Sequence, residues 1–303
     1  MNKRMTFGSA DFALVVTTFL WGLNAVISKN ALGDGPESFR VFVFNGLRIP
    51  AASLLLFATV LMRGESIALR RKDIPTVVAV SFFGMFLFMT CFIMGIYLTS
   101  ASNAGVINAT IPLFILIVSF LSGIDRPTPR TVGGIAVGFM GMLALTFRTG
   151  GFTVNPGDLL IVLSCVSWAI YTVFGKKIVA VYNPMLAIAW VYLFTSLFQL
   201  PLFFYQLGGQ DFVAVSGMNW LNLAVSTLGS VYLANTLYYY AIKKIGPART
   251  GVYTNLTPVF TVMLAALIRG ELITRLQIVG LAVIIAGITI ARSKPASVKT
   301  GNT

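Results

Sequence analysis

The chain has 303 residues, of which 57% are hydrophobic and only 10% are charged, and its mean hydropathy is +0.86. Soluble domains carry about 25% charged residues, so this composition excludes an ordinary soluble protein. A net charge of +13 would suit nucleic-acid binding, but the Lys and Arg residues stand in short clusters between apolar runs and form no basic face. Composition therefore predicts an all-α polytopic membrane protein, with the lipid bilayer as its partner and no nucleic acid.

Apolar runs long enough to span a bilayer recur along the whole chain, and their lengths predict ten transmembrane helices. They cover residues 12–32, 39–62, 74–97, 102–121, 129–147, 158–179, 184–206, 218–242, 249–268 and 276–291. The connections are short, so we expect no soluble domain. We also expect no cleavable signal peptide, because the first run is itself long enough to span.

The first two helices carry the polar residues that need the most explanation. Trp21 and Asn24 share a face of the helix at 12–32, and Asn45 and Arg48 share a face of the next one. An Arg at the centre of a spanning helix costs about 2.5 to 3.5 kcal/mol on insertion scales. Arg48 either holds a substrate carboxylate, ties its helix to neighbouring carbonyl groups, or extends its charged end outward to the membrane surface. Trp21 either lines a cavity or packs between helices.

The remaining helices of the first half add a mixed stripe and a proline. Thr90, Met94 and Tyr97 lie on one stripe of the helix at 74–97, which favours either a pocket wall or helix packing. Pro112 is predicted to kink its helix and free backbone carbonyls. Glycines in the helices at 129–147 and 276–291 indicate that these two helices pack closely.

The second half repeats these features. Trp168 and Tyr171 reproduce the spacing of the first helix, and the helix at 218–242 carries Tyr232, Asn235 and Tyr239. Pro258 is predicted to kink the helix at 249–268. The candidate substrate-binding residues are therefore Trp21, Asn24, Asn45, Arg48, Thr90, Met94, Tyr97, Trp168, Tyr171, Tyr232, Asn235 and Tyr239.

The distribution of cationic residues predicts the orientation. With the N-terminus inside, sixteen Lys and Arg residues fall on the inner side, five fall on the outer side, and Arg48 lies within a helix. Both termini are therefore expected to be cytoplasmic.

The two halves of the sequence resemble each other. "NAGVINATIPLFILIVSF" at Asn103 aligns without gaps with "RTGVYTNLTPVFTVMLAA" at Arg249, and Trp21 aligns with Trp168. Five helices in each half is an odd number, so the second half must enter the membrane from the opposite side. Residues 1–148 and 149–303 are thus predicted to be inverted repeats, which is typical of alternating-access transporters.

Several stretches carry a family resemblance over the whole chain. "FLWGLNAVISKNAL", "GLRIPAASLLL", "GDLLIVLSCVSWAIYTVFGKK" and "NLTPVFTVMLAALIRGELITRLQIVGLAVIIAGI" resemble the EamA-type drug/metabolite transporters. The resemblance implies ten helices around a central cavity, and many members export amino acids or other small metabolites across the bacterial inner membrane. It fixes fold and mechanism better than it fixes the substrate.

The remaining composition bears on energy coupling and on cofactors. The chain has no His, and its acidic residues fall at helix ends or in loops, so we expect facilitated diffusion or coupling through an atypical site. No phosphate-binding loop motif is present, so we expect no ATPase partner. Cys91 and Cys165 are interpreted as small core residues, and we expect no metal and no cofactor.

The sequence therefore predicts a monomeric secondary transporter that is not an enzyme. Its substrate is a small molecule, with hydrophobic or aromatic amino acids as the leading class. A carrier of nucleotide-sugars, purines or drugs on the same fold is the first alternative, although anionic cargo should require more than one buried cation. A membrane enzyme acting on lipids is the alternative from another class, but it would need a cluster of His, Asp or Glu.

Overall fold

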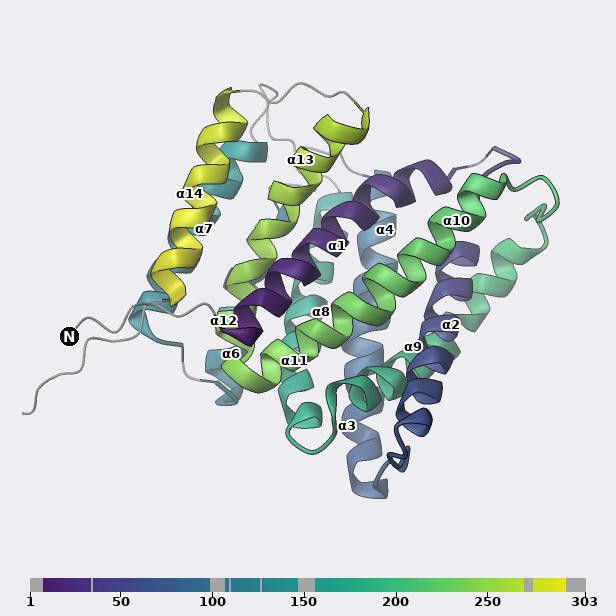
Figure 1. Ribbon diagram of the computed structural model, residues 1–303, viewed down its shortest axis with the longest axis horizontal. Coiled ribbons are helices and arrows are strands. Elements are labelled where there is room, and N and C mark those ends of the chain that lie inside the picture. The colour runs from purple at the N-terminus through teal and green to yellow at the C-terminus, as the bar shows by residue number, and fades with distance from the viewer. Residues whose placement is uncertain are drawn as a thin grey trace, which may run out of the picture.

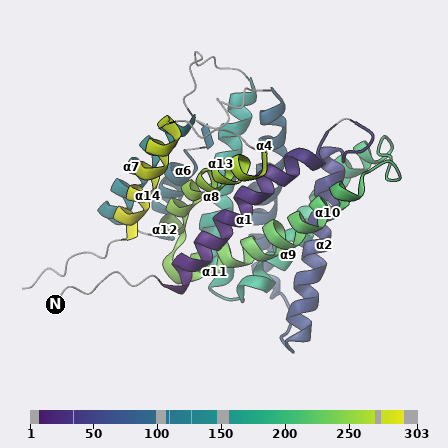
Figure 2. The ribbon, with the colours of Figure 1, turned by 45° about the horizontal axis from the view of Figure 1, so that its top comes forward.

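The computed structural model describes residues 8–33, 35–98, 107–108, 110–125, 127–146, 156–269 and 275–292. These residues form a bundle of tilted helices, which Figures 1 and 2 show from two directions. Within the described residues there is no β-strand, and one isolated bridge joins Leu32 to Phe39. The all-helical class predicted from composition is therefore confirmed.

Where the structure describes the predicted segments, they lie largely in helix. The first half contains α1 (Ser9–Ala31), α2 (Val41–Met62), η1 (Arg71–Asp73), α3 (Ile74–Ala79), η2 (Val80–Phe86), α4 (Leu87–Leu98), α6 (Ile111–Ser122) and α7 (Pro129–Thr146). The second half contains α8 (Pro156–Val179), α9 (Pro184–Leu207), α10 (Gly217–Val225), η3 (Ser226–Ala234), α11 (Asn235–Ile245), α12 (Pro247–Val252), η4 (Tyr253–Asn255), α13 (Leu256–Arg269) and α14 (Arg275–Arg292). Of the segment expected at 102–121, residues 102–106 and 109 lie outside the described residues.

Length and composition make many of these helices suitable for a bilayer. Within the described residues, six helical stretches are long and apolar enough to cross a membrane, and two apolar helices, Ile111–Ser122 and Ile278–Ala291, are shorter. The long stretches are Ser9–Ser28, Val41–Met62, Arg71–Gly95, Pro156–Val179, Pro184–Leu207 and Pro247–Ile268. The protein is thus a polytopic helical membrane protein, because hydrocarbon tolerates backbone only in elements that satisfy their own hydrogen bonds.

Local chemistry explains where several helices begin and end. Asn183 caps α9 by accepting a hydrogen bond from the Leu186 amide at 2.7 Å, and Ser216 does the same for α10 with the Asn219 amide at 3.3 Å. Gly123 ends α6 and Gly246 ends α11 with positive φ angles of 63° and 82°, which glycine adopts without a steric penalty.

The third long helix of each half contains a π-helical segment. η2 lies between α3 and α4, η3 lies between α10 and α11, and the two segments begin 146 residues apart, at Val80 and Ser226. Side chains bond to backbone oxygens inside η3: Asn235 Nδ2 donates to Ser230 O at 2.8 Å and Thr17 Oγ1 donates to Ala234 O at 3.1 Å. π-helical turns of this kind are frequent at functional sites.

The main helix pairs join one half of the chain to the other. α2 packs on α9, α4 on α8, α1 on α13, and α7 on α14. Figure 1 shows α7 and α14 side by side at one edge of the bundle, with α2 and α9 toward the opposite edge. The core is consequently shared, because a helix from each half contributes to each of these interfaces.

Glycine permits the contact between α7 and α14. A Cβ at Gly134 would lie 2.5 Å from the carbonyl oxygen of Gly287, and a Cβ at Gly141 would lie 2.8 Å from that of Gly280. The two backbones therefore touch without side chains between them, as small residues at membrane helix interfaces allow. This confirms the close packing that the glycines predicted.

Candidate functional site

A polar cluster surrounds Arg48, which lies in the second turn of α2. Its Nε donates to Asn45 Oδ1 at 2.9 Å and its Nη1 donates to Ser226 Oγ of η3 at 2.8 Å. A longer contact of 3.5 Å joins Nη1 to Asn24 Oδ1 of α1. Asn24 Oδ1 also accepts hydrogen bonds from Ser226 Oγ at 2.6 Å and from Ser28 Oγ at 3.1 Å. The cluster therefore joins α1, α2 and η3, in both halves of the chain.

The surroundings of the Arg48 guanidinium are asymmetric. One face packs on the Phe44 ring, with Cζ 5.1 Å from the ring centroid. A guanidinium carries five N–H donors, and the hydrogen bonds within the described residues involve only Nε and Nη1. Arg48 remains half-buried, whereas Asn45 and Ser226 are buried. The N–H groups of Nη2 are thus free to bind a carboxylate.

An aromatic cluster lies one turn of α1 away from Asn24. Trp21 contacts Trp168 of α8 edge to face, with ring centroids 5.2 Å apart, and contacts Tyr238 of α11 at 5.1 Å. Phe88 of α4 lies 4.7 Å from Trp168. The buried indole N–H of Trp168 has no hydrogen-bond partner among the described residues. Two tryptophans that align in the sequence repeat therefore contact each other in the middle of the bundle.

Three predicted residues of the second half lie in a sealed tyrosine cluster next to Trp168. Tyr171 donates to Asn235 Oδ1 at 3.3 Å, and Tyr239 donates to the Tyr171 carbonyl oxygen at 3.3 Å. Both tyrosines are fully buried and Asn235 is 6% exposed. A Cβ on Gly175 would lie 2.7 Å from the Tyr239 hydroxyl oxygen, so the ring fits against bare backbone. These side chains pack together in this conformation and leave no exposed surface for a solute.

The other predicted residues lie away from Arg48. Tyr232 of η3 shares a hydrogen bond of 2.9 Å with the Thr59 hydroxyl of α2. Thr90 has a buried hydroxyl without a partner among the described residues, and Met94 is 40% exposed. The side chain of Tyr97 lies outside the described residues.

The two prolines lie in the first turns of helical segments. Pro112 is the second residue of α6, and Pro258 is the third residue of α13, directly after the short 3-10 turn η4. A proline in a first turn lacks an N–H that would be unpaired in any case. The helical path between α12 and α13 changes just before Pro258, as η4 shows.

Sequence reasoning missed Ser226, Ser28 and Tyr238. Ser226 begins the stretch "STLGS", in which hydroxyl residues and glycine interrupt an apolar run. That interruption was the available signal, because polar side chains in a spanning helix require a partner.

At one end of the bundle, Asp125 contacts two other segments of the chain. Its Oδ1 lies 3.4 Å from Lys176 Nζ at the end of α8, and its Oδ2 accepts from the Ala248 amide of α12 at 3.2 Å. Lys176 Nζ also donates to the Ile124 carbonyl oxygen at 3.2 Å. A Cβ on Gly246 would lie 2.6 Å from Asp125 Oδ2. The carboxylate therefore connects three segments, and at the same end Tyr253 bonds to the buried Asp11 of α1.

Comparison with known proteins identifies the fold and its class. The model of the EamA-like transporter family matches residues 8–147 and again residues 155–293. The chain belongs to the EamA-like transporter family. It is thus a membrane-embedded transporter of the drug/metabolite transporter superfamily, as the resemblance implied, and the family points to transport and not to enzymatic activity.

Its relatives occur in several lineages. The chain is 27% identical to the uncharacterized transporter YetK of Bacillus subtilis over 287 residues, which cover 93% of this chain and 86% of YetK. It is 28% identical to the uncharacterized inner membrane transporter YedA of Escherichia coli K12, with 92% of this chain and 89% of YedA covered. A solved crystal structure with 22% identity shares the fold, with a TM-score of 0.78 over 93% of this chain and 96% of that one.

Proposed function

We propose that this EamA-like transporter moves small carboxylate-bearing metabolites, with hydrophobic or aromatic amino acids as the leading class, by alternating access. It works as an exporter in the bacterial inner membrane. The observation that carries the proposal is the half-buried Arg48, whose Nη2 has no hydrogen-bond partner among the described residues.

The polar cluster suits a single carboxylate. Asn45 and Ser226 fix the Arg48 side chain by bonding to Nε and Nη1, so the remaining donors are preorganised. Each N–H that meets a carboxylate oxygen in a place shielded from water forms a charge-assisted hydrogen bond. Within the described residues no second cation joins the cluster, which favours a singly charged acid over a phosphorylated solute.

The aromatic cluster suits the remainder of such a solute. Trp21 is one helical turn from Asn24 and is partly exposed, so an apolar side chain bound near Arg48 can reach its ring. The ring faces can also attract an ammonium group. Trp168 and Tyr238 fix the orientation of Trp21 through edge contacts.

Alternating access follows from a two-part architecture of ten spanning helices, five in each half, with both termini in the cytoplasm. The two stretches that match the family, the 146-residue offset between the π-helices, and the Lys and Arg distribution support this arrangement. The contacts around Asp125 then belong to a closed cytoplasmic end, and a solute would reach Arg48 from the other side in this conformation.

Export without proton coupling agrees with the polar residues of the cluster. No acidic side chain bonds to Arg48, Asn45, Asn24 or Ser226 within the described part of the chain. An imposed proton gradient that concentrates substrate in proteoliposomes would contradict uncoupled transport.

The test is solute efflux from proteoliposomes loaded with a mixture of labelled amino acids and other metabolites. We expect wild-type protein to release apolar and aromatic amino acids selectively. Arg48→Ala and Arg48→Lys should lose that release, because neither retains the planar guanidinium. Arg63→Gln removes an exposed cation at the far end of α2 and should leave the rate unchanged.

Two results would overturn the proposal. Normal selective efflux by a folded Arg48→Ala variant would exclude Arg48 as the carboxylate site. Release of nucleotides, purines or drugs while the amino acids stay inside would keep the family assignment and assign a different substrate class.

A further inference from the structure

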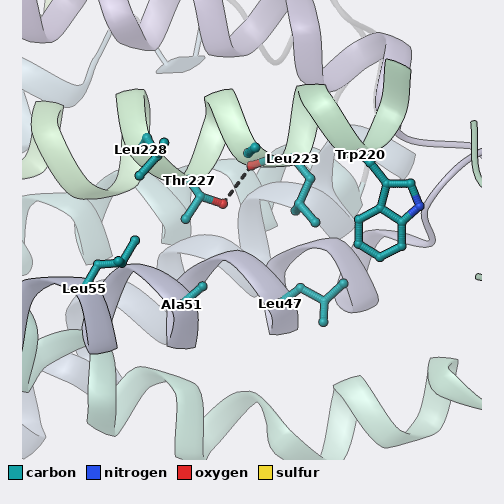
Figure 3. A pocket seen from close by; sticks show the side chains of 8 residues that line it. Leu47, Ala51, Leu55, Trp220, Leu223, Thr227 and Leu228 are labelled. Carbon is teal, nitrogen blue, oxygen red and sulfur yellow. Dashed lines mark hydrogen bonds between the residues drawn. The ribbon is translucent and has the colours of Figure 1, made fainter. Parts of the chain in front are cut away.

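An apolar groove runs between α2 and the α10–η3 helix on the outer surface of the bundle. Leu47, Ala51 and Leu55 of α2 form one wall, and Trp220, Thr227 and Leu228 stand opposite, as Figure 3 shows. The volume is about 430 Å³, within the range of small-ligand pockets. Leu55 and Trp220 are each 41% exposed and Leu228 is 53% exposed, so the groove faces the bilayer.

Besides the indole N–H of Trp220 at one end, aliphatic side chains and one hydroxyl line the groove. Thr227 donates its hydroxyl to the Leu223 carbonyl oxygen of its own helix at 2.7 Å, which is the dashed line in Figure 3. A solute that needs several hydrogen bonds would therefore find too few partners there. A hydrocarbon chain would instead fill the space and remove apolar surface from a poorly packed site.

Both ends of the groove are closed. Trp220 stands at the end where α2 begins, and it packs on Phe39 with ring centroids 5.0 Å apart. The hydrogen bond of 2.9 Å between Thr59 and Tyr232 joins α2 to η3 beyond Leu55 and Leu228. Leu47 and Leu55 are eight residues apart, or about 12 Å along the helix. This length spans most of one leaflet, whose hydrocarbon is about 15 Å thick.

An exposed cation lies next in the chain to Phe39, the residue on which Trp220 packs. Arg40 follows Phe39 in the chain and precedes α2, and its side chain is exposed. A Cβ on Gly209 would lie 2.3 Å from Arg40 Nη1, so the guanidinium rests on bare backbone. None of the described residues accepts a hydrogen bond from the Arg40 guanidinium. Arg40 precedes the first residue of α2 and Leu47 lies about two turns further on, so a phosphate at Arg40 lies beyond the end of the groove where α2 begins.

We propose that this groove binds one phospholipid, with its phosphate on Arg40 and one acyl chain lying between α2 and η3. The charge of the phosphate complements Arg40, and the apolar lining complements the chain. Arg48 of α2 and Ser226 of η3 join these two helices by a hydrogen bond. The bound acyl chain would pack against the same pair of helices from the lipid side. It therefore supports the spacing of the two helices that hold the polar cluster.

The experiment uses full-length protein in nanodiscs that contain phosphatidylglycerol with a photoreactive diazirine on one acyl chain. After illumination, mass spectrometry of peptides locates the labelled residues. We expect the labelling of α2 and η3 peptides around Ala51 and Leu228 to be at least about 5-fold higher than that of the peptides that line the other apolar groove. That groove, lined by Leu116, Ile117, Phe120, Leu121, Pro127 and Val132, is an internal control of about 370 Å³.

Variants separate a specific site from ordinary lipid contact. Ala51→Trp fills the groove and should abolish the excess labelling, and Leu55→Trp is a second blocking variant if the first does not fold. Leu54→Trp adds comparable bulk on the same helix outside the groove, where Leu54 is 66% exposed, and should retain the labelling. Arg40→Gln should reduce the labelling by at least about 3-fold, whereas Arg63→Gln should not.

Two outcomes would overturn the proposal. Equal labelling of both grooves that Ala51→Trp does not change would mean that lipid contacts the protein without a defined site. Excess labelling that Arg40→Gln leaves intact, and that a free fatty acid removes as efficiently as the phospholipid, would refute the role of the phosphate. Neither outcome depends on which solute the protein transports.

Discussion

The carboxylate of Asp125 offers the sharpest prediction, because its charge and its hydrogen bond can be removed separately. Asp125→Asn removes the ion pair with Lys176 but keeps an oxygen that can accept from the Ala248 amide. Asp125→Ala removes both. If these contacts exist only in the conformation described, each variant should shift the population toward the conformation in which this end of the bundle is open.

The size of each shift follows from the geometry. The ion pair is 3.4 Å long, and its side chains are 34% and 21% exposed, so solvent screening limits its contribution to less than about 1 kcal/mol. The hydrogen bond from the Ala248 amide to a charged oxygen adds about 1.5 kcal/mol. Asp125→Asn should then shift the equilibrium by up to about 5-fold and Asp125→Ala by up to about 60-fold, since 1.4 kcal/mol corresponds to a factor of ten.

A cysteine buried close to the Asp125–Ala248 contact can report the shift between the two conformations. Thr250 is fully buried two residues after Ala248, and its hydroxyl has no partner among the described residues. Thr250→Cys, in a background with Cys91 and Cys165 changed to Ala, should react with a maleimide only when this end opens. The initial labelling rate then measures the open fraction.

The order of the labelling rates tests the reasoning. We expect Asp125→Ala to label fastest, Asp125→Asn to be intermediate, and the unaltered aspartate to be slowest. Equal rates in Asn and Ala variants would refute the contribution of the amide hydrogen bond. Unchanged rates in both variants, with normal thermal stability, would show that the contact is not specific to one conformation.

Three further changes have predicted directions. Gly134→Ala should lower thermal stability by about 1–3 kcal/mol, because its Cβ would overlap the Gly287 carbonyl, while Gly133→Ala should not; a melting curve in detergent checks both. Asn24→Ala should weaken substrate binding by about 1–3 kcal/mol in a binding titration, because the buried Ser226 hydroxyl, which also holds Arg48, loses its acceptor. Tyr238→Phe keeps its rings in contact with Trp21 and should cost only about 1 kcal/mol of stability, measured by the same melting curve.

Contrary outcomes are equally concrete. A stable Gly134→Ala protein would mean that α7 and α14 separate easily. Unaltered binding by the Asn24 variant would mean that Ser226 and Asn45 suffice to hold Arg48. A Tyr238→Phe protein that fails to fold would assign a structural role to the hydroxyl that bonds to Thr172 at 3.0 Å.

The helix positions were predictable because hydrophobic runs carry that information directly. The predicted segments at 39–62 and 184–206 differ from α2 and α9 by at most two residues at either end. The tight contact between α7 and α14 was also predictable from the sequence, because glycines in both segments favour close approach of the two backbones.

The partners of the site residues were not predictable from local pattern. Arg48 was singled out by its cost in hydrocarbon, but its bond to Ser226 depends on how η3 crosses α2. The π-helical turns have no periodicity signal in the sequence, yet they determine which oxygens of η3 bond to Thr17 and Asn235. Tyr171 and Asn24 occupy equivalent places in the repeat, and only the three-dimensional packing distinguishes a sealed tyrosine from a partly exposed amide.

The hydrogen bond between Arg48 and Ser226 also affects how the protein is made. The two residues are 178 positions apart, so at about 5–20 residues per second the ribosome needs roughly 10–35 s to deliver Ser226 after Arg48. During this interval only Phe44, Asn45 and Asn24 among the described contacts of the Arg48 guanidinium have been synthesised. α2, α4 and α7 also await their partners in α9, α8 and α14. We therefore expect the insertion machinery to retain α1, α2, α4, α6 and α7, or to shield them from lipid and proteases, until their partners arrive.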